Sequence, residues 1–360
     1  MSEQEAVFAY ERIFCDIKSR ITSGELPAGI KLPPDSEQAK ILGVNRLTVR
    51  KAMERLRKSG LVLRQKGRGT FVNQQPQVRP IRNILYVGCL EGHFYRDLYL
   101  AVQRAGQHVG VCVSGFDVDA DDDAGRLPDF IAGADVVIAL ADTCRQKPAM
   151  EMVGRARRLV LVGDEDRIES GADFCINFSR AAAAERAAQH LVEKGHRRIA
   201  LVTHGIPEHW GQTYDGADPV WHAVSRRFKS VMSDNAEHPE WSVIGTDVSQ
   251  PEQSFRHLLQ RLDMPDRPTA IICDSDFRAQ WVYAAAGRLG LALPDDLSVV
   301  GICDTPWAKQ LLPALTSVNL GEVAAAEILA RFFSGQWPST PVSCCMTPVL
   351  VERESVSRVE

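Results

Sequence analysis

The sequence predicts an α/β protein with a small, basic N-terminal domain followed by a large doubly wound domain. Three observations support this fold class. The first 73 residues contain three amphipathic segments and a glycine-containing hairpin pattern. From residue 84 onward, short apolar segments alternate with amphipathic ones, which is typical of parallel strands joined by helices. At 360 residues the chain is too long for one ordinary domain.

One segment of the small domain, residues 45–56, has the features of a helix with two distinct faces. Its apolar residues recur at i, i+3, i+4 and i+7, which predicts a buried stripe of Val49, Ala52, Met53 and Leu56. Arg46, Thr48 and Arg50 are expected on the opposite side, and Asn45 is expected to be the N-cap. Such residues offer donors to phosphates and base edges. Taken alone, however, the stretch also fits an ordinary amphipathic surface helix.

The flanking segments favour a helix-turn-helix with a wing. Residues 33–44 fit a helix, with Asp35 and Gln38 in capping-box spacing, followed by a glycine turn. Residues 61–72 predict two strands joined by a basic turn, which would form the wing and contains Lys66, Gly67 and Arg68. A first helix is expected at 7–22. Two prolines among polar residues predict an extended linker over 74–83.

The positive charge of the chain is concentrated in the small domain. Residues 1–80 hold 15 Lys and Arg against 8 Asp and Glu, a balance of +7, whereas residues 81–360 hold 27 against 38, a balance of −11. Residues 46–68 contain nine basic residues and one acid, Glu54. A charge run is usually a solvated face, but this one coincides with the predicted helix and wing. The pattern therefore favours DNA as a partner, because neutralising phosphates requires a local basic field.

The cysteines and the hydropathy of the chain set further bounds. The nine cysteines include no C-x-x-C pair and no zinc-type spacing, so the sequence predicts no metal and no cofactor. Several lie in or beside apolar runs and are expected to be reduced and buried, namely Cys89, Cys112, Cys273 and Cys303. No run of 18 apolar residues and no basic-then-apolar leader occurs, which predicts a cytoplasmic protein without a membrane partner.

The large domain is predicted to form two doubly wound units within 280 residues. Strands are expected at 84–87, 109–113, 136–140, 159–162, 174–176, 199–202, 243–246, 270–273 and 297–302. Helices are expected at 94–105, 148–157, 180–193, 221–233, 253–262, 277–289 and 321–333. Ligands of this architecture bind beyond the carboxyl ends of the strands.

Residues 1–73 resemble the winged helix-turn-helix domain of the GntR family of bacterial transcription regulators. The matching stretches follow the family's order and spacing at 24–29, 32–33, 44–52, 56, 59–61 and 67–72. Ser36 stands where the family often has an arginine that contacts phosphate; its hydroxyl can donate to phosphate but adds no charge. The residues expected to contact DNA are Ser36, Asn45, Arg46, Thr48, Arg50, Lys66, Gly67 and Arg68.

Residues 84–360 resemble the effector-binding domain of the LacI family, which shares its fold with periplasmic sugar-binding proteins. The matching stretches are 196–202, 268–276, 290, 294–302, 315–318 and 348–355. The resemblance implies a ligand crevice between two lobes, one built from about 84–178 with a returning segment near 304–335, the other from 179–303 with the C-terminal strand. The combination of both domains resembles the arabinose repressor class of chimeric regulators.

The resemblance also suggests residues that contact the effector. Asp276 matches the acid that accepts hydrogen bonds from ligand hydroxyls, although it could instead cap the helix at 277–289. Phe94 and Tyr95 match aromatic residues that line the crevice, and Asn177 stands where the family usually has an aspartate. Trp210 and Trp221 belong to a long aromatic loop and could stack on a sugar, anchor the loop or form a dimer surface.

The sequence thus predicts a homodimeric transcription regulator, most simply a repressor. It would have a winged helix-turn-helix domain over 1–73, a linker over 74–83 and an effector-binding domain over 84–360, with an operator and a small sugar-like ligand as its partners. A dimer is expected because one head covers only a half-site. Two alternative functions also fit a protein with these domains. One is an enzyme acting on a sugar-like ligand in the large domain, for which no phosphate loop, nucleophile elbow or metal motif is found. The other is a purely architectural DNA binder.

Overall fold

The computed structural model describes residues 3–22, 25–65, 67–73, 81–88, 90, 93–118, 124–141, 152–164, 172–204, 219–235, 240–247, 250–334, 337 and 342–359. The chain divides into two compact units. Unit 1 comprises Met1–Gly163, Arg167–Asn177 and Val323–Cys344, and unit 2 comprises Asp164–Asp166, Phe178–Glu322 and Cys345–Glu360. None of the helices within the described ranges is both long and apolar enough to cross a membrane.

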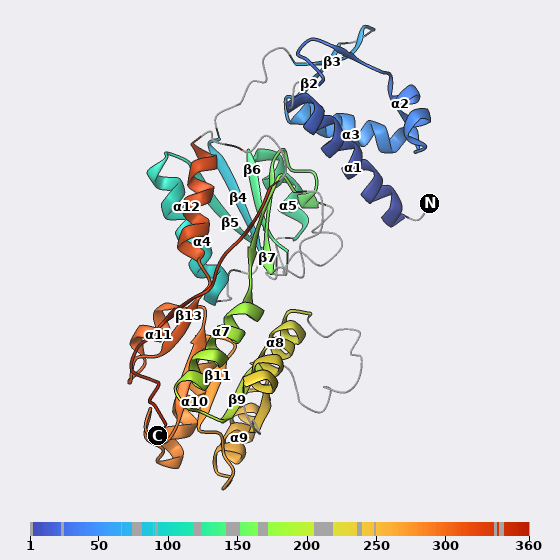
Figure 1. Ribbon diagram of the computed structural model, residues 1–360. Helices are drawn as coiled ribbons and strands as arrows, with labels where there is room; N and C mark the ends of the chain where they lie inside the picture. Colours follow the sequence, from blue (N-terminus) through green and yellow to red (C-terminus); the bar gives the residue numbers. More distant parts are fainter. Residues whose placement is uncertain are drawn as a thin grey trace. The chain divides into compact units, whose positions relative to one another are not determined.

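The first 73 residues, here called the head, form three helices and a small antiparallel sheet (Figure 1, blue). The elements are α1 (Glu3–Thr22), β1 (Lys31–Leu32), α2 (Asp35–Leu42), α3 (Arg46–Lys58), β2 (Val62–Gln65) and β3 (Gly69–Val72), with the strands in the order β1-β3-β2. The three expected helices and the hairpin are therefore confirmed. β1 was not predicted, because two residues carry no readable alternation.

The core of the head is the stripe that the sequence predicts on α3. Val49, Ala52 and Leu56 are fully buried, and they pack with Ile13 and Phe14 of α1 in one apolar cluster. The predicted capping box on α2 is wrong. The N-cap position is Pro34, whose side chain cannot accept a hydrogen bond. The Gln38 side chain instead donates to the carbonyl oxygen of Pro33 at 2.8 Å.

Unit 1 also contains a six-stranded sheet with the strand order β14-β8-β7-β6-β4-β5. Its elements are β4 (Asn83–Gly88), α4 (His93–His108), β5 (Cys112–Asp117), η1 (Ala124–Arg126), α5 (Leu127–Gly133), β6 (Val136–Leu140), β7 (Leu159–Asp164), β8 (Phe174–Phe178), α12 (Glu322–Phe333) and β14 (Val342–Cys345). β4 pairs in parallel with β5 and β6, and β6 pairs in parallel with β7. Figure 1 shows α4 and α12 on one side of this sheet and α5 on the other.

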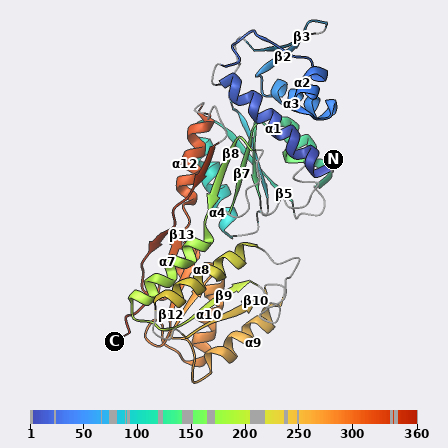
Figure 2. The ribbon, with the colours of Figure 1, turned by 45° about the vertical axis from the view of Figure 1, so that its right-hand side comes forward.

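Unit 2 contains a second six-stranded sheet, in the order β10-β9-β11-β12-β13-β15. Its elements are α7 (Arg180–Glu193), β9 (Arg198–His204), α8 (Pro219–Asn235), β10 (Glu240–Thr246), α9 (Pro251–Leu262), β11 (Ala270–Cys273), α10 (Asp276–Leu289), β12 (Ser298–Ile302), α11 (Pro306–Gln310), β13 (Thr316–Asn319) and β15 (Val349–Val351). All pairs are parallel except β13 with β15. The helices α9 and α10 cover one face, and α7 packs against α8 on the other (Figure 2).

The two doubly wound units are thus as expected, but several details differ. The segment that returns to unit 1 begins at Val323 and not near residue 304, because β13 pairs with β12 and keeps residues 304–322 in unit 2. β5 begins at Cys112, whose side chain is exposed, so the expectation that Cys112 is buried is wrong. Cys273 and Cys303 are buried as expected, whereas Cys89 and residues 148–151 of the helix predicted at 148–157 lie outside the described residues. The domain boundaries around 74–83 stay a prediction, since residues 74–80 are also outside them.

Close packing around Gly301 joins β12 to its neighbours in unit 2. A methyl group on Gly301 would overlap the carboxylate of Asp276 and come within 2.7 Å of Leu315 Cδ2. Gly287, in α10, has nothing within 4 Å of the same position. The two glycines therefore form a matched pair, since one is required by close packing and the other is not.

We predict that Gly301→Ala destabilises the protein and Gly287→Ala does not. Overpacking in a filled core costs about 1–3 kcal/mol, whereas replacing an exposed helical glycine by alanine stabilises by about 0.5–1 kcal/mol. Urea unfolding of both variants measures the difference. Equal stability of the two variants would contradict the packing described for Gly301.

Candidate DNA interface and effector site

The outer side of α3 carries a set of exposed basic residues. Arg46 and Arg50 are both exposed, and at 3.6 residues per turn they lie about 40° apart around the helix axis. Arg57 also lies on this flank and is paired with Glu54, with 2.5 Å between Arg57 Nη2 and Glu54 Oε1. Arg46 and Arg50 thus lie on a solvent-facing surface, as expected for a helix that contacts DNA.

Thr48 does not share this surface, and the expectation that it lies opposite the apolar stripe is wrong. Only 6% of Thr48 is exposed. Thr48 lies about 160° around the helix axis from both Arg46 and Arg50 and about 20° from Arg55, which is itself only 5% exposed. It therefore falls on the flank that packs towards the core of the head.

The beginning of α3 is fixed by its cap. Asn45 is exposed, and its side-chain oxygen accepts a hydrogen bond from the backbone N–H of Leu47 at 2.9 Å. This is the N-cap role that the sequence predicts. The bond satisfies one of the free N–H groups of the first turn and holds the backbone around Leu47 in place.

The wing is a hairpin of β2 and β3 with an exposed basic turn. Gly67 has a φ of 75°, in the left-handed region that favours glycine, and the Arg68 N–H donates to the Gln65 carbonyl at 3.0 Å. The Arg68 side chain is exposed, and Ser36 is exposed in the first turn of α2. Lys66 lies outside the described residues. The described part of the wing is thus compatible with contact to a nucleic acid backbone.

In unit 2, buried polar side chains gather at the carboxyl ends of the strands, with Asp276 among them. Asp276 is 0% exposed and lies in the first turn of α10, just beyond β11. Its carboxylate accepts hydrogen bonds from the Ser317 hydroxyl at 2.6 Å, the Thr305 N–H at 2.6 Å and the Thr305 hydroxyl at 2.9 Å. The alternative role as a helix N-cap is wrong, because Ser275 occupies that position. Asp276 instead joins α10 to the ends of β12 and β13.

Burial determines the protonation of this group. It raises the pKa of the Asp276 carboxyl group from 3.8 to about 7, although the hydrogen bonds from Ser317 and Thr305 lower the pKa. The carboxyl group therefore exchanges its proton near neutral pH.

A second buried group surrounds Arg278, two residues further along α10. Its guanidinium donates to Asp274 Oδ1 at 2.9 Å, to the Thr246 hydroxyl at 2.8 Å and to the Ser275 hydroxyl at 3.2 Å. Asp274 and Arg278 are 1% and 7% exposed. Sequence reasoning did not predict Arg278, although its i,i+4 spacing from Asp274 is a signal for an ion pair.

The segment after β12 completes this edge of the sheet. Cys303 and Asp304 both have positive φ values, 105° and 51°, which is unusual for residues other than glycine. Asp304 pairs with Arg353 at 2.5 Å, and its N–H donates to the Ser317 hydroxyl at 3.0 Å. Strained backbone held by such contacts is common at binding sites. We define the carboxyl-edge cluster as Thr246, Asp274, Asp276, Arg278, Asp304, Thr305, Ser317 and Arg353.

The other residues expected to contact an effector belong elsewhere. In unit 1, Phe94 is buried with Tyr95 beside it, the two ring centroids being 5.5 Å apart. Asn177, also in unit 1, is 7% exposed and donates to the Ser343 hydroxyl at 2.8 Å. Trp210 lies outside the described residues; Trp221 lies in α8, but its side chain is not described. That Phe94, Tyr95 and Asn177 of one unit share an effector site with Asp276 of the other stays a prediction, whereas Thr305 and Ser317, the hydrogen-bond partners of Asp276, were not predicted.

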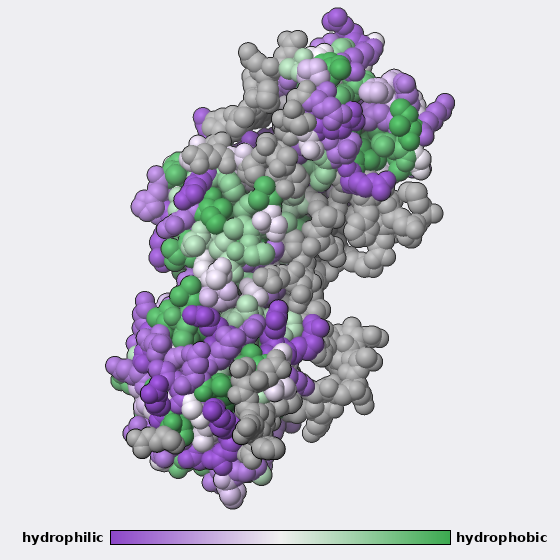
Figure 3. Space-filling model, in the orientation of Figure 1, coloured by the Kyte–Doolittle hydropathy of each residue, from purple (hydrophilic) through white to green (hydrophobic). Residues whose placement is uncertain are grey.

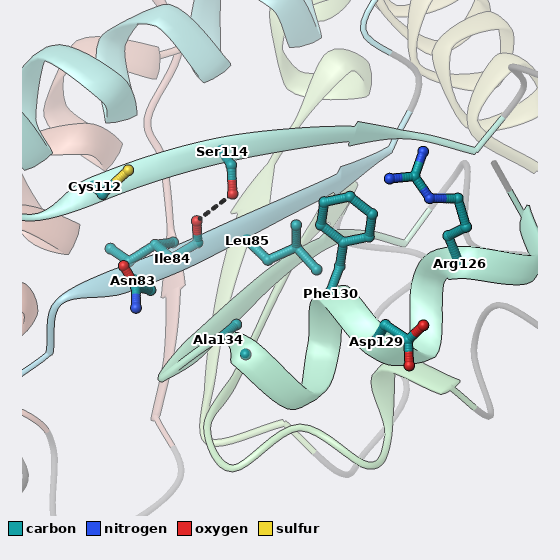
Figure 4. Close-up of a pocket in the computed structure, with 10 residues that line it drawn as sticks. Asn83, Ile84, Leu85, Cys112, Ser114, Arg126, Asp129, Phe130 and Ala134 are labelled. Carbon is teal, nitrogen blue, oxygen red and sulfur yellow. Dashed lines mark hydrogen bonds between the residues drawn. The ribbon is translucent and has the colours of Figure 1, made fainter.

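Unit 1 also has a pocket of about 440 Å³ at the amino ends of β4 and β5. Figure 4 shows Phe130 and Arg126 from the α5 region beside Leu85 and Ser114 of the strands. The Ser114 hydroxyl donates to the Ile84 carbonyl at 3.3 Å. This pocket lies at the end of the sheet away from the carboxyl ends of β4 and β5, and its lining includes none of the residues that the sequence suggests for effector binding.

Comparison with known families matches both parts of the chain. Residues 9–72 match the bacterial regulatory proteins of the gntR family, and residues 188–356 match the periplasmic binding protein-like domain. The chain joins a gntR-family regulatory domain to a periplasmic binding protein-like domain. The exposed arginines of α3, Arg46 and Arg50, lie in the gntR-family match. The carboxyl-edge cluster lies in the periplasmic binding protein-like match.

A curated repressor matches part of the chain. The HTH-type transcriptional repressor PurR of Escherichia coli (strain SE11) is 28% identical over 218 residues, which span 59% of this chain and 60% of that protein. The chain thus spans 60% of the length of the curated relatives it matches.

Solved structures share the fold of the large domain. A LacI transcriptional regulator from a Rhodococcus species is 21% identical with a TM-score of 0.62, covering 77% of this chain and 99% of that one. A LacI family regulator from Enterococcus faecium with bound ribose is 17% identical with a TM-score of 0.61, covering 77% and 100%. A third, from Arthrobacter sp. FB24 in complex with lactose, is 19% identical with a TM-score of 0.61 and the same coverage.

The protonation of Asp276 predicts a specific pH dependence of stability. Because the folded pKa of about 7 lies above the unfolded value of 3.8, folding favours the protonated acid. The associated stabilisation of the folded state is fully present below pH 3.8, the pKa of the unfolded chain. It is lost as the pH rises through about 7, the pKa of the folded state. We predict that between pH 5 and pH 8 the unfolding free energy of the parent falls by about 2 kcal/mol more than that of Asp276→Asn. Parallel pH profiles in urea unfolding would contradict the raised pKa.

Proposed function

We propose that the protein is a sequence-specific, DNA-binding transcription regulator, acting as a repressor whose operator affinity is controlled by a small hydroxylated ligand. The observation that carries this proposal is the combination in one chain of a gntR-type domain with an exposed basic helix and a periplasmic binding protein-like domain with a buried polar cluster. The relatives named above are transcription regulators, which supports a regulator over an enzyme.

The DNA-binding part of the proposal rests on charge and exposure. Arg46 and Arg50 start the helix that would enter the major groove, and Arg68 lies in the wing beside it. Arginine forms paired hydrogen bonds with the edge of guanine and also contacts phosphates. We therefore assign base contacts to Arg46 and Arg50 and backbone contacts to the wing, which includes Lys66, Gly67 and Arg68.

The ligand part of the proposal rests on the donors that Asp276 uses. Two of its three partners are hydroxyl groups, those of Thr305 and Ser317. A sugar offers the same donor, so a ligand hydroxyl can replace a protein hydroxyl on this carboxylate with little change in chemistry. The structural relatives with bound ribose and lactose support a sugar as the ligand class. Asp276 thereby serves as the polar anchor, and Arg278 and Asp304 offer further polar groups.

Homodimerisation is part of the same proposal. A single head of this size covers one half-site, and palindromic operators match two-fold symmetric dimers.

We predict different effects for arginines of the helix and of the wing. Arg46→Ala should weaken binding to an operator enriched from random duplexes by about 1–3 kcal/mol and relax the preference at one base position. Arg68→Ala should weaken binding to all sequences and reduce the steepness of the salt dependence. Arg288→Ala, exposed in unit 2, is the control and should change nothing. Fluorescence anisotropy measures the affinities, and equal losses on operator and random DNA for Arg46→Ala would refute its base contact.

We predict that a thermal-shift screen of free sugars, beginning with ribose and lactose, identifies a stabilising ligand. At pH 8, where the carboxyl group is ionised, Asp276→Ala should lower the affinity for that ligand by about 10- to 100-fold, since a hydrogen bond to a charged group is lost. It should bind operator like the parent when no ligand is present. Asp295→Ala, exposed in unit 2, serves as the control. If Asp276→Ala still responds at the ligand concentration that switches the parent, the anchor lies elsewhere.

A further inference from the structure

The first turn of α3 exposes a large apolar side chain. Leu47 is 64% exposed, whereas Val49, Ala52 and Leu56 of the same helix are fully buried. At 3.6 residues per turn, Leu47 lies about 160° from Val49 and about 180° from Leu56. It therefore points away from the core of the head, and burial within the head does not explain why this residue is apolar.

Basic residues flank Leu47 on both sides. Arg50 and Arg46 lie about 60° and 100° from it on one side, and Lys51 lies about 40° from it on the other. All three are exposed. The backbone N–H of Leu47 is held by the Asn45 side chain at 2.9 Å, so the residue is anchored in the capped first turn. Figure 3 shows apolar side chains beside strongly hydrophilic ones on the surface of the head.

This arrangement selects the chemistry of the partner. A surface with an apolar centre and a cationic border suits an anionic partner that also presents a small apolar group. The major groove of DNA has this combination, because phosphates line its edges and the 5-methyl group of thymine is the apolar feature of the base-pair edges. A hydrophobic protein partner fits less well, since the arginines and the lysine would lose water without gaining an opposite charge.

We propose that Leu47 is a specificity-determining residue that selects thymine by packing against its 5-methyl group. This inference rests on the proposed function, in which α3 enters the major groove. It adds an apolar contact to the hydrogen bonds assigned to Arg46 and Arg50. Each half-site then has a thymine at one position that Leu47 contacts, and the preference there does not depend on a hydrogen bond.

The test replaces thymine by uracil, which differs only in lacking the 5-methyl group. The full-length protein first enriches an operator from random duplexes, and each thymine of that operator is then replaced in turn by deoxyuridine. For the parent protein, replacement at one position in each half-site should weaken binding about fourfold, the value expected for one buried methyl group. With Leu47→Ala, the same replacement should have no effect, and operator re-selection should lose thymine at that position.

Ile41→Ala provides the matched control. Ile41 is also an exposed apolar residue of the head, at 71%, but it belongs to the last turn of α2. This variant should keep the full sensitivity to the thymine methyl group. Thermal unfolding of Leu47→Ala should match that of the parent, because its side chain is exposed.

Three results would overturn the inference. The first is that the parent binds every uracil-substituted operator as well as the original one. The second is that Leu47→Ala retains the full sensitivity to the methyl group. The third is that Leu47→Ala weakens all operators equally while lowering the dimer content in sedimentation, which would assign Leu47 to contact with a second copy. Failure of the proposed function looks different, since no sequence would then be enriched above random DNA.

Discussion

The buried carboxyl group of Asp276 holds together the carboxyl edge of the sheet in unit 2. Its hydrogen bonds to Thr305 and Ser317 connect α10 with the segments after β12 and within β13. Gly301 is needed because any larger residue would overlap the same carboxylate. A group that is so buried is costly unless each oxygen has partners. The shape of this edge therefore depends on which groups donate hydrogen bonds to Asp276, whether they belong to the protein or to a ligand.

The head distributes its polar groups in the opposite way. Its basic side chains Arg46, Arg50 and Arg68 are exposed, and a compact apolar core beneath them holds α3. Exposed charges cost little in water and act over a Debye length, which suits a surface for a polyanion. In the carboxyl-edge cluster of unit 2, Asp274 and Arg278 are buried and paired, which suits the recognition of a small molecule by geometry. One chain thus combines a basic surface suited to a polyanion with a buried polar site suited to a small molecule.

The regular helices and strands of this structure could be predicted from the sequence. Features that depend on contacts between residues far apart in the sequence could not. The stripe of α3 and strands such as β6 and β11 follow directly from periodicity and apolar runs. Thr48 lies on the flank opposite to Arg46 and Arg50, and only packing within the head shows that this flank is buried. β13 and β14 are short and partly polar, so only pairing with other strands makes them strands. The hydrogen-bond partners of Asp276 lie 29 and 41 residues away in the sequence, and no local sequence pattern predicts them.

The central claim is that ligand binding and operator binding are coupled in one protein. By linkage, any factor by which the ligand changes operator affinity must equal the factor by which operator DNA changes ligand affinity. Isothermal titration of the ligand found by screening, with and without saturating operator duplex, measures this directly. The account predicts ligand affinities that differ by the factor found in DNA-binding titrations with and without ligand. Identical ligand affinities in the presence and absence of operator would contradict it.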